Sequence, residues 1–212
     1  SNKYAYYQGN SGVSIGSFFR RILFAWKYSD INYLVTNYIT SESKILYVRD
    51  IKERVEKIAP FLHYDGDPYI TISEGRLIWI FDAYTKTEYY PYSTPFENKK
   101  NYVRNSVKIT VDAYTGDVKF YLFKPEEDPI VRVYKKIFPD LFRNLDEMPE
   151  SLRAHLRYPQ DLFDVQAKMY QQYHMTESQI FYNKEDLWTI ANEKYDGKIQ
   201  PMESFYAIMK LP

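Results

Sequence analysis

The sequence predicts an α+β domain: an antiparallel or mixed sheet with helices before and after it, packed mainly on one sheet face. Apolar residues recur every three to four positions in residues 12–62 and again in residues 128–191, which is the period of an amphipathic helix. In residues 69–123 the period changes to two, which is that of a half-buried strand. The 212 residues are enough to bury one core, so we expect residues 1–212 to form a single domain.

The first predicted helix follows a polar leader, residues 1–11, which has no period and is expected to be loosely held. Ser14 is expected to cap this helix. Its apolar stripe consists of Ile15, Phe18, Phe19, Ile22, Leu23 and Trp26. Such a stripe faces a core or, with Arg20, Arg21 and Lys27 on the other side, lies on a membrane surface. Since three basic residues are few and the stripe is as wide as a globular core requires, we expect it to face the core.

Two further helices are predicted before the sheet. Asp30 is expected to cap a short one, and a longer one starts near Asp50 and ends at Pro60. The same spacing rule gives their inward residues, which are Ile31, Leu34, Val35, Tyr38, Ile51, Val55, Ile58, Ala59 and Leu62.

Two hairpins are predicted in the middle of the chain. Their strands are expected at residues 69–73, 76–83, 105–113 and 117–123, with turns at 74–75 and 114–116. Alternation places one apolar set on one sheet face, namely Leu77, Trp79, Phe81, Ala83, Val107, Ile109, Val111 and Ala113. Asp-Ala-Tyr-Thr occurs at 82–85 and again at 112–115, so we expect these two strands to end alike and to be neighbours in one antiparallel sheet.

The last third is predicted to be helical. Residues 88–102 are too many for a tight turn and are expected to form a surface loop. Asp128 followed by Pro129 is a helix start, with Ile130, Tyr134, Ile137 and Phe138 facing inward. Short helices are expected at 149–157, 159–173, 176–182 and 184–191, and a strand-like run at 203–210 is expected to rejoin the sheet.

Composition excludes several functions. The 28 basic and 28 acidic side chains leave no net field to attract nucleic acid. The absence of cysteine excludes disulfides, thiol nucleophiles and cysteine-ligated metals. The 23 tyrosines suit an interface or a carbohydrate contact, and they equally suit a half-buried sheet in a composition-biased organism. No apolar run approaches the roughly 20 residues that cross a bilayer.

Three stretches carry a family resemblance: GVSIGSFFRRILFAW at 12–26, RDIKERVEKIAPFL at 49–62, and the segment from Pro139 to Trp188. Through them the chain closely resembles uncharacterised protein family zero-one-eight-two. These are large bacterial proteins with an N-terminal block of transmembrane helices and a long extracytoplasmic region. The resemblance implies a location at the cell membrane, with this region extracytoplasmic, and other envelope or membrane proteins as partners. The chain itself is expected to be a soluble fragment of such a protein.

Asp82 and Asp112 are the candidate paired carboxylates. Placed at the ends of like strands, they could perform acid–base chemistry on a glycosidic bond. The same residues also suit turns, because Asp accepts hydrogen bonds from nearby backbone and Gly116 permits a positive φ. We favour the turn interpretation.

Arg153, His155 and Arg157 are the candidate ligand-binding residues. The two arginines lie four positions apart, on one face of the predicted helix, and could hold a phosphate or carboxylate. The alternative, which we favour, is that they form ion pairs with neighbouring acids. The acids in question are Glu147, Glu150 and Asp161.

His63, Asp65 and Asp67 resemble the start of a calcium loop. Pro68 interrupts the loop, and no glutamate stands at its twelfth position. We therefore expect a turn in which the aspartates bind their own backbone, with no metal and no cofactor in the chain.

The sequence identifies no catalytic residue. Together with the resemblance, it favours a non-catalytic binding or assembly module. The alternative is a domain that hydrolyses cell-envelope glycan or peptide with carboxylates near the sheet.

Overall fold

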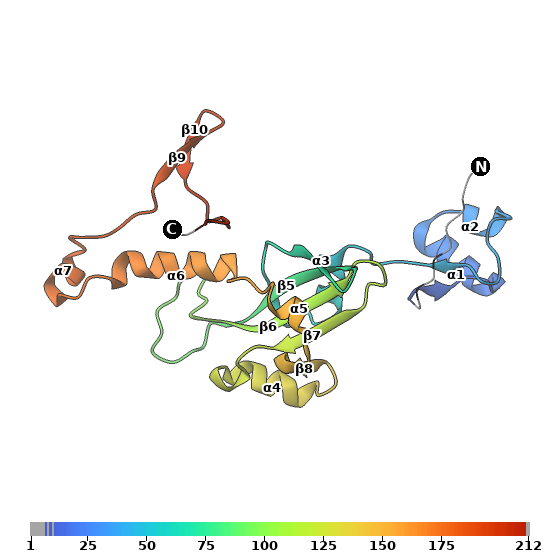
Figure 1. Ribbon diagram of the computed structural model, residues 1–212, viewed down its shortest axis with the longest axis horizontal. Helices are drawn as coiled ribbons and strands as arrows, with labels where there is room; N and C mark the ends of the chain where they lie inside the picture. Colours follow the sequence, from blue (N-terminus) through green and yellow to red (C-terminus); the bar gives the residue numbers. More distant parts are fainter. Residues whose placement is uncertain (1–6, 8, 10, 211–212) are drawn as a thin grey trace.

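The computed structural model describes residues 7, 9 and 11–210 (Figure 1). The strands are β1 (Val13–Ser14), β2 (Lys44–Ile45), β3 (His63–Tyr64), β4 (Tyr69–Ser73), β5 (Arg76–Thr87), β6 (Tyr102–Asp112), β7 (Val118–Leu122), β8 (Phe142–Asn144), β9 (Asn192–Tyr195) and β10 (Lys198–Pro201). The helices are α1 (Phe18–Tyr28), α2 (Asn32–Val35), α3 (Ile51–Ile58), η1 (Pro125–Glu127), α4 (Pro129–Ile137), η2 (Leu145–Glu147), α5 (Glu150–Arg153), α6 (Gln160–Tyr173) and α7 (Ser178–Asn183).

A mixed sheet forms the centre of the molecule. In the described part of the chain its order is β3-β5-β6-β7-β8, and β4 pairs with the first half of β5. All neighbours are antiparallel except β7 and β8. Both predicted hairpin turns are present, with positive φ at Glu74, Gly75 and Gly116. The α+β prediction is therefore confirmed.

The predicted sheet register is also confirmed. Trp79 pairs with Val111, Phe81 with Ile109, and Ala83 with Val107. These six residues share the main core, in which Trp79 is partly buried and the others are buried. Leu77 and Ala113 lie beyond it at the sheet end, where both are exposed.

Helices cover both faces of the sheet. The larger core lies under α3 and α4, through Val55, Ala59, Val131 and the apolar residues of β5, β6 and β7. A smaller core on the other face joins Tyr121 to Met148 and Leu152. This second face also receives the beginning of α6, and it carries the candidate site.

Side-chain caps explain where two helices start. Asp50 accepts a hydrogen bond from Glu53 N–H at 2.8 Å, as the sequence predicts for the start of α3. Asp128 accepts one from Ile130 N–H at 2.9 Å, and Pro129 follows it at the first position of α4. The inward face of α4 differs from the prediction, because Val131 and Tyr134 contact the core while Ile137 and Phe138 are exposed.

The predicted orientation of the first helix is wrong. α1 begins after Ser17 and not after Ser14, which belongs to β1. Ile15, the first residue of the predicted stripe, precedes the helix and is buried. The part of the stripe on α1 faces outward, with Phe18 68% exposed and Trp26 82% exposed. The other side of the helix packs instead, because Arg21 donates to the carbonyls of Ile15 and Ile39.

The end of the chain also departs from the prediction. Residues 184–191 form no helix and residues 203–210 form no strand. The antiparallel strands β9 and β10 pair only with each other among the described residues. Most of the predicted leader, residues 1–11, lies outside the described residues.

The molecule is extended (Figure 1). The unit of α1 and α2 lies at one end and α7 at the other, beyond α6, while the β9–β10 hairpin stands beside α6. Within the described residues no helix combines the length and apolar character needed to cross a membrane.

Candidate functional site

The two candidate carboxylates, Asp82 and Asp112, do not converge. β5 continues to Thr87, so Asp82 lies within the strand and not at its end. Asp82 pairs with Lys108, whereas Asp112 pairs with Ile78. The two pairs are four positions apart along the strands, which is a distance of roughly 13 Å. The two catalytic carboxylates of a glycosidase are separated by only roughly 5 to 10 Å. The sequence predicts that Asp82 and Asp112 each stand at the end of a strand, and this prediction is wrong for Asp82.

Asp112 is a turn residue, as the sequence predicts. Its Oδ1 accepts from Tyr114 N–H at 3.0 Å and from Thr115 N–H at 2.8 Å. Arg76 forms an ion pair with the other oxygen at 2.7 Å. Partial burial acts to raise the pKa of Asp112, but the bonds from Thr115 and Arg76 outweigh it and lower the pKa.

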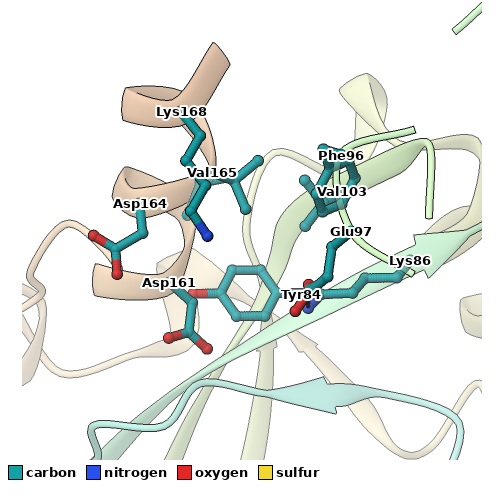
Figure 2. A pocket seen from close by; sticks show the side chains of 10 residues that line it. Tyr84, Lys86, Phe96, Glu97, Val103, Asp161, Asp164, Val165 and Lys168 are labelled. Carbon is teal, nitrogen blue, oxygen red and sulfur yellow. Dashed lines mark ion pairs between the residues drawn. The ribbon is translucent and has the colours of Figure 1, made fainter. Parts of the chain in front are cut away.

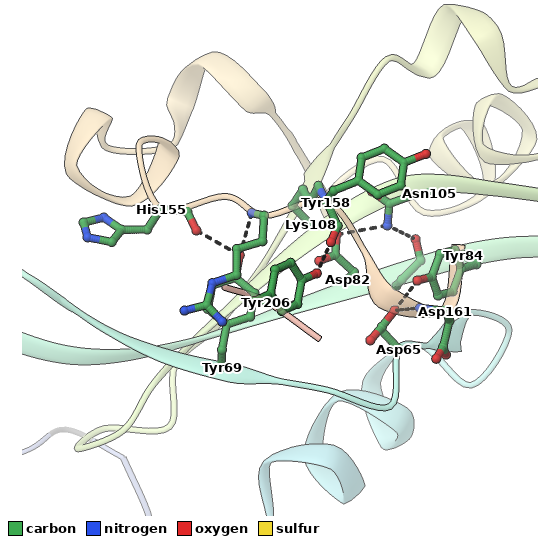
Figure 3. Close-up of polar contacts among 12 residues, drawn as sticks. Asp65, Tyr69, Asp82, Tyr84, Asn105, Lys108, His155, Tyr158, Asp161 and Tyr206 are labelled. Carbon is green, nitrogen blue, oxygen red and sulfur yellow. Dashed lines mark hydrogen bonds and ion pairs between the residues drawn. The ribbon is translucent and has the colours of Figure 1, made fainter. Parts of the chain in front are cut away.

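Asp82 belongs instead to a buried polar network on the α6-facing side of the sheet (Figure 3). Its carboxylate pairs with the Lys108 ammonium, and the two side chains are 5% and 4% exposed. Asn105 Nδ2 donates to Asp82 Oδ1 at 3.0 Å. Burial raises the pKa of Asp82, and the contacts with Lys108 and Asn105 oppose that rise.

Asp65 connects three parts of the network (Figure 3). It accepts from Tyr84 Oη on β5, from Asp67 N–H at 3.0 Å within its own turn, and from Asp161 N–H at 3.3 Å at the start of α6. Gly66 N–H donates back to Asp161 Oδ2 at 3.4 Å. Pro159 at the N-cap position provides no side-chain cap, so Asp65 supplies one from another element.

These contacts confirm a turn at Asp65 and Asp67. His63 and Asp67 are exposed while Asp65 is buried, so the three side chains do not surround one point. In the part of the chain that is described, no three His, Cys, Asp or Glu residues are grouped to hold a metal ion. The absence of metal and cofactor stays a prediction.

Burial shapes the ionisation of the network. It raises the pKa of Tyr84, and the neighbouring Asp65 carboxylate raises it further. It likewise raises the pKa of Asp161, again with Asp65 as the second cause. Asp65, Asp82 and Asp161 thus bring three carboxylates into a region where Lys108 is bonded directly to Asp82.

The candidate ligand-binding residues separate. α5 ends at Arg153, so Arg153 and Arg157 do not lie on one helical face. Arg153 forms ion pairs with Glu150 at 3.0 Å and Asp146 at 3.6 Å, which confirms the predicted pairing with Glu150. The exposed His155 places Nδ1 2.7 Å from the carbonyl of Ser151.

Arg157 has a different environment. Its guanidinium carbon lies 4.3 Å from the centre of the Tyr69 ring and 5.1 Å from that of Tyr206. Tyr69 Oη also accepts from Arg157 N–H at 3.1 Å and donates to the carbonyl of His155 at 3.1 Å. Burial raises the pKa of Tyr69 to about 12, so its hydroxyl keeps its proton at neutral pH.

A cavity of about 210 Å³ opens beside the network, between β5, the 88–102 loop and α6. Figure 2 shows Asp161, Asp164 and Lys168 of α6 on one side of it and Lys86 and Glu97 on the other. Lys86 and Glu97 form an ion pair at 3.8 Å. The cavity is small and its charged residues are of both signs, so it offers no concentrated field for one kind of ion.

The sequence interpretation missed four residues of the network, namely Lys108, Asn105, Tyr84 and Asp161. For Lys108 the signal was present, because a register that pairs Phe81 with Ile109 also pairs Asp82 with Lys108. No local pattern joins Asp65 to Asp161, which are separated by 96 residues. The hydrogen bonds of the network connect β5, β6 and α6. The carboxylates of Asp65 and Asp82 accept these bonds.

Comparison with known proteins gives one consistent answer. The model of a family described as "Uncharacterised protein family (UPF0182)" matches residues 1–212. A UPF0182 protein of Pelotomaculum thermopropionicum is 51% identical over 211 residues, covering 100% of this chain and 23% of the relative. One of Desulforamulus reducens is 52% identical over 213 residues, covering 100% and 23%. One of Methanospirillum hungatei is 48% identical over 217 residues, covering 100% and 24%.

The chain thus spans about 23% of the length of the first two relatives. No solved structure matches it significantly.

Proposed function

The chain belongs to the uncharacterised protein family UPF0182, and from this premise we propose that it is a non-catalytic assembly module of a longer membrane protein. In this proposal the module lies outside the cytoplasm. Its extended ends pack against other segments of the same protein or against neighbouring envelope proteins. The observation that carries the proposal is the outward apolar face of α1.

That face is continuous. Phe18, Phe19, Ile22, Leu23 and Trp26 are each between 41% and 82% exposed. At 100° per residue they span about 140° of the helix surface. A monomeric protein rarely exposes so many adjoining large apolar side chains, because leaving each in water costs about 1.5–3 kcal/mol relative to burial.

The opposite side of α1 is already in use. Arg21 binds the carbonyl of Ile39 at 2.8 Å, and the Phe24 ring lies 6.3 Å from that of Tyr47. These contacts fix which side of the helix faces the chain. The helix therefore cannot turn its apolar side inward without losing them, and the apolar side needs a partner from elsewhere.

A second unpartnered surface lies at the other end. An open groove of about 1050 Å³ runs between α6 and residues 189–206, and Phe163, Met202 and Phe205 are among the residues that line it. Since the relatives are about four times longer than this chain, segments of the longer protein are available to cover both surfaces.

The hydrolase alternative receives less support. Asp82 is buried and bonded to Lys108 and Asn105, and Asp112 is bonded to its own turn and to Arg76. Neither carboxylate faces an open cavity together with the other. A general acid or base must reach the proton it transfers, which Asp82 in its present position does not.

Photo-crosslinking tests the assembly role. A photoreactive amino acid is placed at Trp26 in the full-length protein in its own membrane. The control position is Glu56, which lies on the exposed side of α3. We expect crosslinks from position 26 to another segment of the protein or to a neighbouring protein, and few from position 56. Equal, background-level crosslinking at both positions would contradict the proposal.

A labelling experiment tests the location. The chain has no cysteine, so a single cysteine at Glu56 in a cysteine-free background is a unique target. We expect a membrane-impermeant maleimide to label it in intact cells. Labelling that occurs only after lysis would place this region in the cytoplasm and overturn the extracytoplasmic assignment.

A further inference from the structure

A cavity of about 480 Å³ lies on the same sheet face as the polar network, between β6, the η1 turn and the segment that joins α5 to α6. Its volume is in the range of small-molecule sites. Phe123, Leu156 and Leu162 give it an apolar part. Its cationic side chains are Arg104, Lys108, Lys124 and Arg157.

Arg157 is the cation best placed to receive a ligand. Tyr69 and Tyr206 hold its guanidinium at 4.3 and 5.1 Å, which limits the positions that the group can adopt. No carboxylate within 4.0 Å and no side-chain hydrogen bond is recorded for it among residues 7, 9 and 11–210. A held guanidinium with unused N–H groups is suited to bidentate binding of an oxyanion.

The remaining charges leave the cavity cationic. Arg104 and Lys124 both approach Glu127, at 3.5 and 3.4 Å, so two cations share one carboxylate. Asp128 keeps its negative charge while its two oxygens accept hydrogen bonds, so with Glu127 and the Asp82 partner of Lys108 the four cations of the cavity face three carboxylates. The donors to Asp128 are Thr85, Tyr102, Ser106 and Ile130.

Lys108 forms the floor of the cavity. Its ammonium is paired with Asp82 and lies 5.2 Å from the centre of the Phe123 ring. An ammonium has three N–H donors, and the structure gives this one a single hydrogen bond among the described residues. It can therefore donate to a ligand without releasing Asp82.

We propose that this cavity binds the phosphate group of a small organic ligand. Arg157 holds two phosphate oxygens, and Lys124 or Arg104, which share Glu127, contacts a third. Lys108 donates to a polar atom at the floor, and Phe123, Leu156 and Leu162 contact the carbon part of the ligand. A phosphate is favoured over a carboxylate because it presents a third oxygen to Lys124 or Arg104 after Arg157 has bound two. The site does not depend on the assembly role of the chain.

The phosphate can belong to a free molecule or to a lipid headgroup, so the test has two arms. Isothermal titration calorimetry measures the binding of glycerol 3-phosphate, with glycerol as the neutral control. Flotation measures binding to phosphatidylcholine vesicles with and without phosphatidic acid. Arg157→Gln removes the charge while keeping the length of the side chain. Arg153→Gln is the matched control, because Arg153 lies outside the cavity and pairs with Glu150.

We expect one arm to show binding that Arg157→Gln weakens at least about tenfold, since a charge-assisted bond is lost. Arg157→Lys should recover part of it, and Arg153→Gln should leave it unchanged. Binding of glycerol 3-phosphate identifies a free phosphate ligand. Binding only to phosphatidic acid vesicles identifies a lipid headgroup. No binding in either arm, or binding that Arg157→Gln leaves unchanged, overturns the proposal.

Discussion

At the scale of single residues, the buried pair of Asp82 and Lys108 dominates the polar side of the sheet. Removing two charges from water costs several kcal/mol per ion, and close contact with good hydrogen bonding must offset this cost. Asn105 supplies one additional bond to Asp82. Such a pair adds little net stability, because an apolar pair of similar size would be about as stable.

Lys108→Met tests this balance. The substitution leaves the Asp82 carboxylate buried without its cation, so the free energy of unfolding should fall by about 3–5 kcal/mol in urea denaturation. The double variant Asp82→Leu with Lys108→Met removes both charges and should recover most of that loss. A double variant as unstable as the single one would show that the pair itself is a main source of stability.

Asp161→Asn tests the crowding of carboxylates at the start of α6. Burial and Asp65 raise the pKa of Asp161 above its ordinary value of 3.8. A raised pKa means that the folded state binds the Asp161 proton more tightly than the unfolded state does. Protonation of Asp161 therefore stabilises the fold at low pH, and this stabilisation is lost as pH rises through the folded pKa. The asparagine keeps an oxygen for Gly66 N–H and carries no charge.

At pH 7 the Asp161→Asn variant should therefore melt at the same or a higher temperature than the unchanged chain. The gain should disappear near pH 4, where Asp161 itself becomes protonated. Thermal melts across this pH range measure the difference. A variant that loses stability at pH 7 and regains it at low pH would reverse the assigned direction of the pKa shift.

At the scale of elements, one residue joins α4 to the sheet. Asp128 is 1% exposed and accepts bonds from Thr85 on β5, from Tyr102 and Ser106 on β6, and from Ile130 at the first turn of α4. The cap is thus also a connection between helix and sheet. The sequence predicts the cap, and the paired strands β5 and β6 supply the other donors.

Asp128→Ala should cost more than an ordinary cap. An exposed N-cap aspartate contributes about 1 kcal/mol, whereas this change also leaves the buried hydroxyls of Thr85 and Ser106 without their acceptor, at about 1–3 kcal/mol each. Asp50→Ala at the start of α3 is the control, because Asp50 is exposed and its carboxylate accepts one hydrogen bond, from Glu53 N–H. Equal losses of unfolding free energy for the two variants would refute the connecting role.

At the scale of the whole molecule, stability is unevenly distributed. The buried residues gather around the sheet, α3 and α4. No buried residue is recorded in α1, α6 or α7, and β9 and β10 pair only with each other among the described residues. An isolated two-stranded hairpin is marginally stable in water, so β9 and β10 should be less stable than the central sheet.

Amide hydrogen exchange should reveal this difference. In the isolated chain, amides of residues 192–201 should exchange at least roughly a hundredfold faster than those in the centres of β5 and β6, because opening the hairpin exposes no core. In the full-length protein the same amides should slow down. Equal protection of hairpin and sheet in the isolated chain would contradict the account.

Prediction from sequence succeeded where the signal is local. The alternation along β5 and β6 gave the register of Trp79 with Val111 and of Phe81 with Ile109. The same register contains the pair of Asp82 and Lys108, which is why that part of the site could have been found. The paired-carboxylate hypothesis failed because a shared tetrapeptide at Asp82 and Asp112 does not specify where a strand ends.

The sequence by itself determined the α+β class, the two hairpins, the caps at Asp50 and Asp128, and the family. The hairpins and the caps depend on residues a few positions apart, where backbone geometry sets the outcome, whereas the family rests on similarity along the whole chain. Only the tertiary structure decided that the apolar face of α1 points outward and that Asp65 caps α6. It also decided that Arg157 lies between Tyr69 and Tyr206. These features join residues far apart in the chain, and a hydrophobic pattern specifies which face needs burial without specifying what buries it.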